Sequence, residues 1–265
     1  MKNWKQIKII DTHTHTNMSP LEEDFHTIAQ QALAKGVGFN IVSCDRKMCD
    51  LAIFQARQYD HIVASVGYHP TDLKDLKDED LDYLEQLIIN HNDQIVCVGE
   101  VGLDYYHELE YSREYQKEWF IKQIKLALKY NLTLNLHIRY AHDDAIQILQ
   151  KYQVKKVIIH CFTDAYRFIP IYNQLGYYVS FPGVITFKAT PKNNILELYE
   201  CVRAVDLDRI LVETDAPFLT PTPYRGKTNY PYYVIETAKK IAEIRNVSEE
   251  EMFAILKKNA LRSFV

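Results

Sequence analysis

The sequence has no run of about 18 uninterrupted apolar residues, the length that a membrane-spanning helix needs. The apolar run in its N-terminal segment, MKNWKQIKIIDTHTH, is too short for a secretory signal peptide. No Gly/Ser/Pro-rich linker, internal repeat or low-complexity tract divides its 265 residues. We therefore expect one domain over residues 1–265, no membrane partner, and a protein that is not exported by a classical signal.

Disulfide spacing and excess positive charge are also missing. The five cysteines are an odd number without a CxxC pair, which predicts free thiols in the cytoplasm. The 31 Lys and Arg residues are outnumbered by 35 Asp and Glu, so the net charge is −4. Because no chain-wide positive field exists, any nucleic acid must be bound locally. Hydrophobic residues at 47% and charged residues at 25% are typical of globular proteins and exclude disordered, collagen-like and coiled-coil chains.

Short apolar segments rich in β-branched residues recur along the chain, with helical periodicity between them. The eight segments are residues 7–11, 38–44, 62–67, 95–100, 132–137, 156–160, 177–181 and 210–214. Alternating strands and helices imply parallel pairing through right-handed crossovers. Eight strands close a (β/α)₈ TIM barrel, which typically takes about 250 residues. We expect this α/β fold, although a doubly wound open sheet would show the same local pattern.

Titratable side chains gather where these strands end, at the positions from which a barrel builds its active site. They are His13 and His15 after the first strand, His69 after the third, Glu100 at the end of the fourth, His137 and His160 at the ends of the fifth and sixth, and Asp215 after the eighth. Taken singly, each has an ordinary explanation as a hydrogen-bonded core histidine, a salt-bridged acid or a turn cap. Taken together, the two carboxylates and the four histidines other than His69 on one rim predict a metal centre instead.

The spacing of these residues suggests how metal is held. His13 and His15 stand two residues apart in extended chain, so both imidazoles can reach one ion. Six ligands exceed what one tetrahedral zinc takes, and a carboxylate can offer one oxygen to each of two ions. We expect two divalent metal ions about 3.5–4 Å apart, as in two-metal hydrolases. Imidazoles suit Zn²⁺ and carboxylates suit Mg²⁺ or Mn²⁺, so the metal is left open.

The motifs around these residues resemble the TatD family of metal-dependent hydrolases, deoxyribonucleases with a TIM-barrel fold. They are DTHTH (11–15), GYHP (67–70), GEVGLDY (99–105), HIR (137–139), HCF (160–162), ETDAPFL (213–219) and PYRGKTN (223–229). The resemblance covers essentially the whole chain. It implies that the metal ligands are His13, His15, Glu100, His137, His160 and Asp215, with Glu100 bridging. Thr163-Asp164 departs from the family pattern of a small residue and a glycine, which puts the substrate rim in doubt.

The expected chemistry is hydrolysis of a phosphodiester, an ester bond, by a metal-activated water. Asp215 both binds metal and accepts the water's proton as general base. For substrate contacts we expect His69 and Arg139 to meet phosphates, with a hydrogen bond to the metal ligands and a barrel salt bridge as their respective alternatives. Arg225 in the last loop is expected to bind a single strand, unless that loop is simply solvated.

The substrate and assembly follow from charge and from the resemblance. With few local cations, we expect short or 3′-terminal single-stranded DNA to be the partner, cut by a 3′ to 5′ exonuclease of the type that the family suggests. Tyr105 and Tyr106 could stack on a terminal base. We expect a monomer.

Two other functions use the same residues. A metal-dependent hydrolase of another bond, such as an aminoacyl-tRNA deacylase or an amidohydrolase, shares the fold and ligand types. Many amidohydrolase barrels bridge their metals through a modified lysine, and Glu100 at that place favours the nuclease. A metal-dependent binding protein without turnover is the third hypothesis, and the intact ligand positions speak against it.

Overall fold

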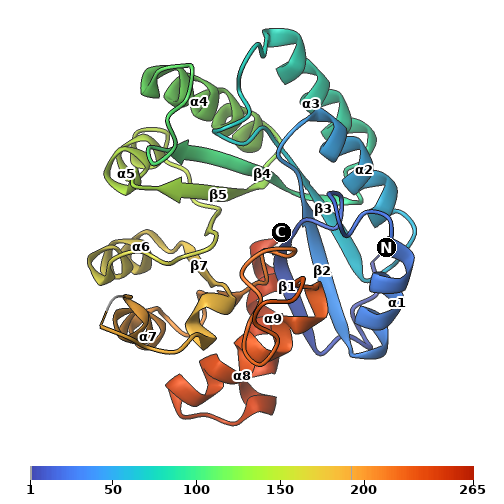
Figure 1. Cartoon of the computed structure of the whole chain (residues 1–265). Helices are drawn as coiled ribbons and strands as arrows, with labels where there is room; N and C mark the ends of the chain where they lie inside the picture. The colour runs from blue at the N-terminus through green and yellow to red at the C-terminus, as the bar shows by residue number, and fades with distance from the viewer. Residues whose placement is uncertain (1, 192) are drawn as a thin grey trace.

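The computed structural model describes residues 2–191 and 193–265. Eight parallel strands pair in the order of the sequence: β1 (Ile9–Thr14), β2 (Val37–Val42), β3 (Ile62–Val66), β4 (Ile95–Asp104), β5 (Thr133–Arg139), β6 (Val157–Ile159), β7 (Tyr178–Phe181) and β8 (Ile210–Val212). Figure 1 shows the helices arranged around the outside of these strands. This arrangement confirms the predicted TIM barrel.

Nine α-helices are described in residues 2–191 and 193–265, and three short 3₁₀ turns lie among them. The helices are α1 (Phe25–Ala34), α2 (Arg46–Ala56), α3 (Asp78–Asn90), α4 (Arg113–Lys129), α5 (His142–Lys151), α6 (Ile169–Leu175), α7 (Ile195–Ala204), α8 (Val234–Arg245) and α9 (Glu249–Ser263), and the turns are η1 (Tyr166–Phe168), η2 (Gly183–Thr186) and η3 (Pro231–Tyr233). Over this part of the chain, every helix is too short or too polar to cross a membrane.

The strands are buried on both faces, which is why they read as nearly continuous apolar segments. Every residue of β1, β2 and β3 is buried. A small apolar cluster that includes Ile10, Cys97 and Leu211 joins β1, β4 and β8. Next to it lie buried polar side chains such as Thr12, which hydrogen-bonds to Ser180 of β7 at 3.0 Å. Thr12 is the neighbour of His13 in β1, so the polar part of this strand adjoins the histidines.

Two strands change register at the predicted metal ligands. The pairing of β1 with β2 shifts between Asp11 and Thr14, and that of β4 with β5 shifts between Val98 and Val101. Such irregularities re-aim side chains and often lie beside active sites. They place His13 inside β1 rather than after it, and they let β4 continue past Glu100, where the sequence had suggested that the strand ends.

The barrel closes between β8 and β1 through few backbone contacts. Thr14 and Ala216 form an isolated parallel bridge. His15 N donates to Ala216 O at 2.7 Å, and Asp215 N donates to His13 O at 2.9 Å. The segments that complete the barrel are therefore the same segments that carry three of the predicted ligands.

Candidate metal centre

One cavity of about 1010 Å³ opens at the carboxyl ends of the strands. Its lining includes His15, His69, Glu100, His137, His160 and Asp215. His13 is fully buried and contacts this group from inside the barrel. The structure thus brings all six predicted ligands, and His69, to one place.

Glu100 lies in the middle of the group, and its two oxygens face different histidines. Oε2 is 3.3 Å from His13 Nε2 and 3.7 Å from His15 Nε2. Oε1 is 2.9 Å from His137 Nδ1 and 3.1 Å from His160 Nε2. A carboxylate in this position can offer one oxygen to each of two cations.

Asp215 extends the His13–His15 side of the centre. Its Oδ1 is 3.4 Å from His15 Nε2 and 3.9 Å from His13 Nε2. The backbone at Asp215 has a φ of 56°, which turns the chain directly after β8. The Asp215 side chain is 16% exposed, against 5% for Glu100, so it is the more open of the two carboxylates.

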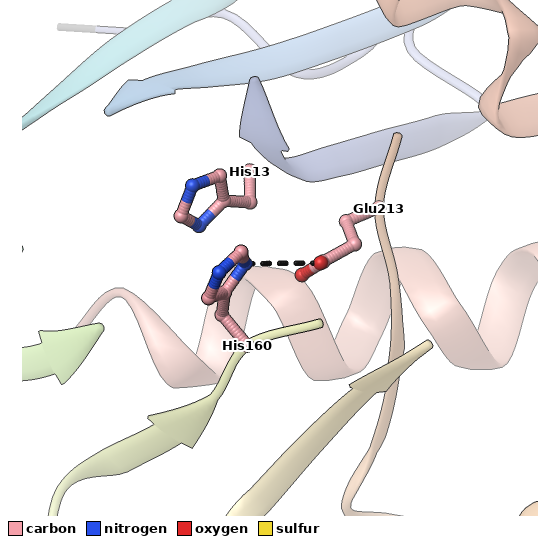
Figure 2. A group of neighbouring side chains, drawn as sticks. All are labelled: His13, His160 and Glu213. Carbon is pink, nitrogen blue, oxygen red and sulfur yellow. Dashed lines mark hydrogen bonds and ion pairs between the residues drawn. The ribbon is translucent and has the colours of Figure 1, made fainter. Parts of the chain in front are cut away.

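The outer nitrogen of each of three histidines meets an acceptor that orients its ring. His13 Nδ1 lies 3.1 Å from Asn135 Oδ1, and His15 Nδ1 lies 3.0 Å from the carbonyl oxygen of Val42. Figure 2 shows the His13 ring stacked against His160, which turns its Nδ1 to Glu213 Oε1 at 3.0 Å. An acceptor on Nδ1 fixes the proton there and leaves the Nε2 lone pair for the centre.

His137 and His69 approach Glu100 from the other side. His137 Nε2 is held at 2.9 Å by Asp104 Oδ2, which directs His137 Nδ1 toward Glu100. His69 Nε2 is 3.3 Å from Glu100 Oε1, while its Nδ1 is 2.6 Å from Thr71 Oγ1. His69 therefore lies directly against the Glu100 carboxylate.

The histidine nitrogens that point into the centre face carboxylate oxygens or one another, so a cation or protons must lie between them. Burial lowers the pKa of His160, but Glu213 and Glu100 outweigh burial and raise that pKa well above its usual value. Burial works to raise the pKa of Glu100, but His160, His69 and His13 hold it well below its usual value. Without a cation, protons meet this demand.

The donor set fits divalent metal. Three groups of side chains bring their ligand atoms close enough to hold an ion: His13, His15 and Glu100; His69, Glu100 and His137; and His13, His160 and Glu213. Oriented imidazoles with ionised carboxylates suit Zn²⁺ and Mn²⁺, and metal binding there releases the protons. His69 belongs to one of these groups, although the sequence suggested it as a substrate contact or as a hydrogen-bond partner of the ligands.

Sequence reasoning missed the residues that orient the ligands. Asn135 and Glu213 each stand two positions before a predicted ligand, so strand periodicity could have placed them on the same face. Asp104 falls within the motif at 99–105, but its bond to His137 joins β4 to the neighbouring strand β5. The bond from Asn135 to His13 joins residues far apart in sequence and had no local signal.

The expected substrate contacts divide into two groups. Arg139 lines the cavity and lies with its Cζ 3.7 Å over the Tyr106 ring. Arg225 lies over Phe187 at 3.7 Å and donates to Thr220 O at 3.1 Å, and it does not line the cavity that holds the histidines. The structure therefore brings Arg139, but not Arg225, to the centre.

The unusual Asp164 also lines this cavity, but its charge is already partnered. Its Oδ2 is 3.1 Å from His142 Nε2, and its Oδ1 accepts from the backbone of Ala165. His142 stacks on Phe168 at 4.2 Å and bonds to the hydroxyl of Tyr172. The rim carboxylate is thus held against the wall by a buried imidazole.

The family model described as "TatD related DNase" matches residues 10–265. An uncharacterized metal-dependent hydrolase of Bacillus subtilis, YabD, is 37% identical over 97% of this chain and 98% of its own length. The uncharacterized metal-dependent hydrolase YcfH of Escherichia coli is 33% identical over 97% of this chain and 95% of its own. Among solved structures, the TatD homolog YJJV of Escherichia coli superposes with a TM-score of 0.90 at 26% identity, covering 98% of both chains.

Proposed function

Because the chain belongs to the TatD family of metal-dependent hydrolases, we propose that it is a nuclease that removes nucleotides from the 3′ end of short single-stranded DNA. The observation that carries the proposal is the position of Glu100, with one oxygen toward His13 and His15 and the other toward His137 and His160. On this proposal residues 1–265 act as one domain and as a monomer. The five free thiols support the cytoplasmic setting.

Two divalent cations would be held by this chain's own side chains. His13 and His15 lie near one oxygen of Glu100 and near Asp215, and His137 and His160 lie near the other oxygen of Glu100. When bound, such cations lower the pKa of water toward neutrality and offset the charge of a phosphodiester. The acceptors at Nδ1 of His13, His15 and His160 hold the proton on that nitrogen and orient each ring so that the Nε2 lone pair faces the cations.

Asp215 is assigned the proton transfer. Burial raises the pKa of Asp215, but its hydrogen bond with His15 and the charge of His160 outweigh burial and lower that pKa below the usual carboxyl value. An ionised carboxylate with partial exposure to the cavity can accept a proton from water at neutral pH. The more enclosed Glu100 is assigned the bridging role.

The test is cleavage of a single-stranded oligonucleotide labelled at its 5′ end, with Mg²⁺, Mn²⁺ or Zn²⁺ added to metal-stripped protein. We expect a ladder of products shortened from the 3′ end, and EDTA should stop it. Asp208→Asn changes an exposed acid just before β8 that does not line the cavity, and it serves as the matched control for Asp215→Asn. Intact oligonucleotide with every metal would refute the nuclease.

The same preparation should be offered aminoacyl-tRNA, lactone and simple ester substrates. Fold and ligands alone do not separate these activities. Turnover of one of them, together with inert DNA, would move the assignment to another bond while leaving the metal centre in place.

A further inference from the structure

The mouth of the cavity carries an exposed aromatic group beside the metal centre. Arg139 and Tyr140 stand two and three residues after His137 and line the same cavity. Two residues of strand span about 6.6 Å, so the Arg139 position is within reach of a small ligand bound at the centre. Tyr106, from the loop after β4, lies under the Arg139 guanidinium at 3.7 Å and meets the Tyr140 ring edge-to-face at 5.7 Å.

These rings present free surface. Tyr140 is 70% exposed and Tyr106 is 51% exposed. The backbone at Tyr140 has a φ of 55°, a left-handed conformation that is unfavourable for a bulky side chain and that asparagine or glycine adopts more easily. A strained, exposed aromatic residue at a cavity mouth points to a contact made by its ring.

The charge of the cavity limits what such a contact can hold. Arg139 is the only Lys or Arg that lines it in the described part of the chain, and it forms no ion pair there. Further carboxylates stand on the walls, namely Asp45, Asp72, Asp164 and Glu197. A ligand with one or two phosphates and an aromatic group matches these surroundings better than a long polyanion does.

We propose that Tyr140 and Arg139, backed by Tyr106, form the subsite for the nucleobase of the terminal nucleotide, with the base stacked on the Tyr140 ring. This inference rests on the proposed nuclease function. Base stacking on an aromatic side chain tolerates any sequence, because every base has a π face. The subsite therefore selects for the presence of a base and not for its identity.

The experiment compares two oligothymidylates that differ only at the 3′ end, which is either thymidine or an abasic tetrahydrofuran residue. We expect Tyr140→Asn, which suits the left-handed backbone, to lower kcat/KM for the thymidine end by about tenfold and to leave the abasic end unchanged. Tyr140→Phe should retain the wild-type preference. Tyr166→Asn changes an exposed tyrosine that does not line the cavity, and it is the matched control.

Each outcome decides the matter. An equal loss on both substrates would mean that Tyr140 only shapes the loop, and no loss would mean that its ring is not used; either result overturns the subsite. If the wild type cuts neither substrate, the nuclease proposal fails, and calorimetry with thymidine 5′-monophosphate and deoxyribose 5-phosphate then tests the subsite separately. Tyr140→Asn must weaken binding of the nucleotide alone, and equal binding by variant and wild type would refute the inference.

Discussion

Replacing Glu213 by glutamine separates the orientation of a proposed metal ligand, His160, from the stability of the fold. Glu213 is fully buried, and its Oε1 accepts from His160 Nδ1 at 3.0 Å and from Cys161 N at 2.8 Å. Its Oε2 is buried and has no hydrogen-bond partner among the described residues. Glutamine keeps the shape and one acceptor oxygen, while it removes the negative charge that makes His160 a stronger ligand.

The expected size follows from these contacts. Hydrogen bonds to a charged group contribute about 1.5–3 kcal/mol and neutral ones about 0.5–1.5 kcal/mol, so the exchange weakens the hold on His160 by roughly 1 kcal/mol or more. Loss of a carboxylate behind a metal-ligating histidine typically lowers metal affinity about 10- to 100-fold. The metal-free fold should survive, because glutamine has nearly the same shape and keeps one oxygen that can accept from His160 Nδ1 and Cys161 N.

The assay is titration calorimetry of Mn²⁺ into metal-stripped Glu213→Gln, with thermal unfolding of the metal-free variant measured alongside it. Glu200→Gln, at an exposed position on α7, is the matched control and should bind Mn²⁺ as the wild type does. An unchanged Mn²⁺ affinity in Glu213→Gln would show that this carboxylate does not orient a ligand.

Three more predictions test the centre and its rim. Asp215→Asn should abolish turnover while the circular dichroism spectrum stays native, and retained activity would remove its role as base. Glu100→Gln offers one ligand oxygen in place of two, so calorimetry should find two Mn²⁺ ions per wild-type chain and fewer in the variant; equal stoichiometry would contradict the bridge. The hydrogen bond with His142 lowers the pKa of Asp164, so its stabilising effect is present above the usual carboxyl pKa of about 3.9 and is lost as pH falls through the lower folded pKa. Asp164→Asn should accordingly reduce urea stability near pH 6 by about 1 kcal/mol, with a difference that shrinks below pH 4, and a pH-independent difference would refute the pairing.

The barrel could be predicted because its strands are buried on both faces. Short continuous apolar segments differ from the three-to-four-residue repeat of amphipathic helices, and each of the eight predicted segments overlaps an observed strand. The exact strand ends could not be predicted. The register shifts beside His13 and Glu100 are set by pairing with neighbouring strands, and a period of two along one segment does not reveal them.

The six candidate ligands were found because histidines and acids are conspicuous at the ends of apolar strands. Their supports were not found, because Asn135 and Glu213 look like ordinary polar residues until the barrel folds. Nor could the sequence show that Arg225 would turn onto Phe187 and Thr220 while Arg139 turned onto Tyr106. The direction of each arginine side chain depends on which aromatic ring the tertiary fold places beside it, and the sequence alone does not show this.

The acceptors behind the histidines also explain why a centre with so many imidazoles can exist inside a barrel. Five imidazole rings lie around the Glu100 carboxylate. If all five rings were protonated, their positive charges would repel one another. If all five were neutral, buried lone pairs would face one another without a partner. The acceptors at Nδ1 of His13, His15 and His160 fix the tautomer of each ring, because they require a proton on Nδ1. The Nε2 lone pair of each ring is then available to bind either a metal ion or a proton. Competition between metal and protons follows directly, and metal affinity should fall as pH is lowered through the raised pKa of His160.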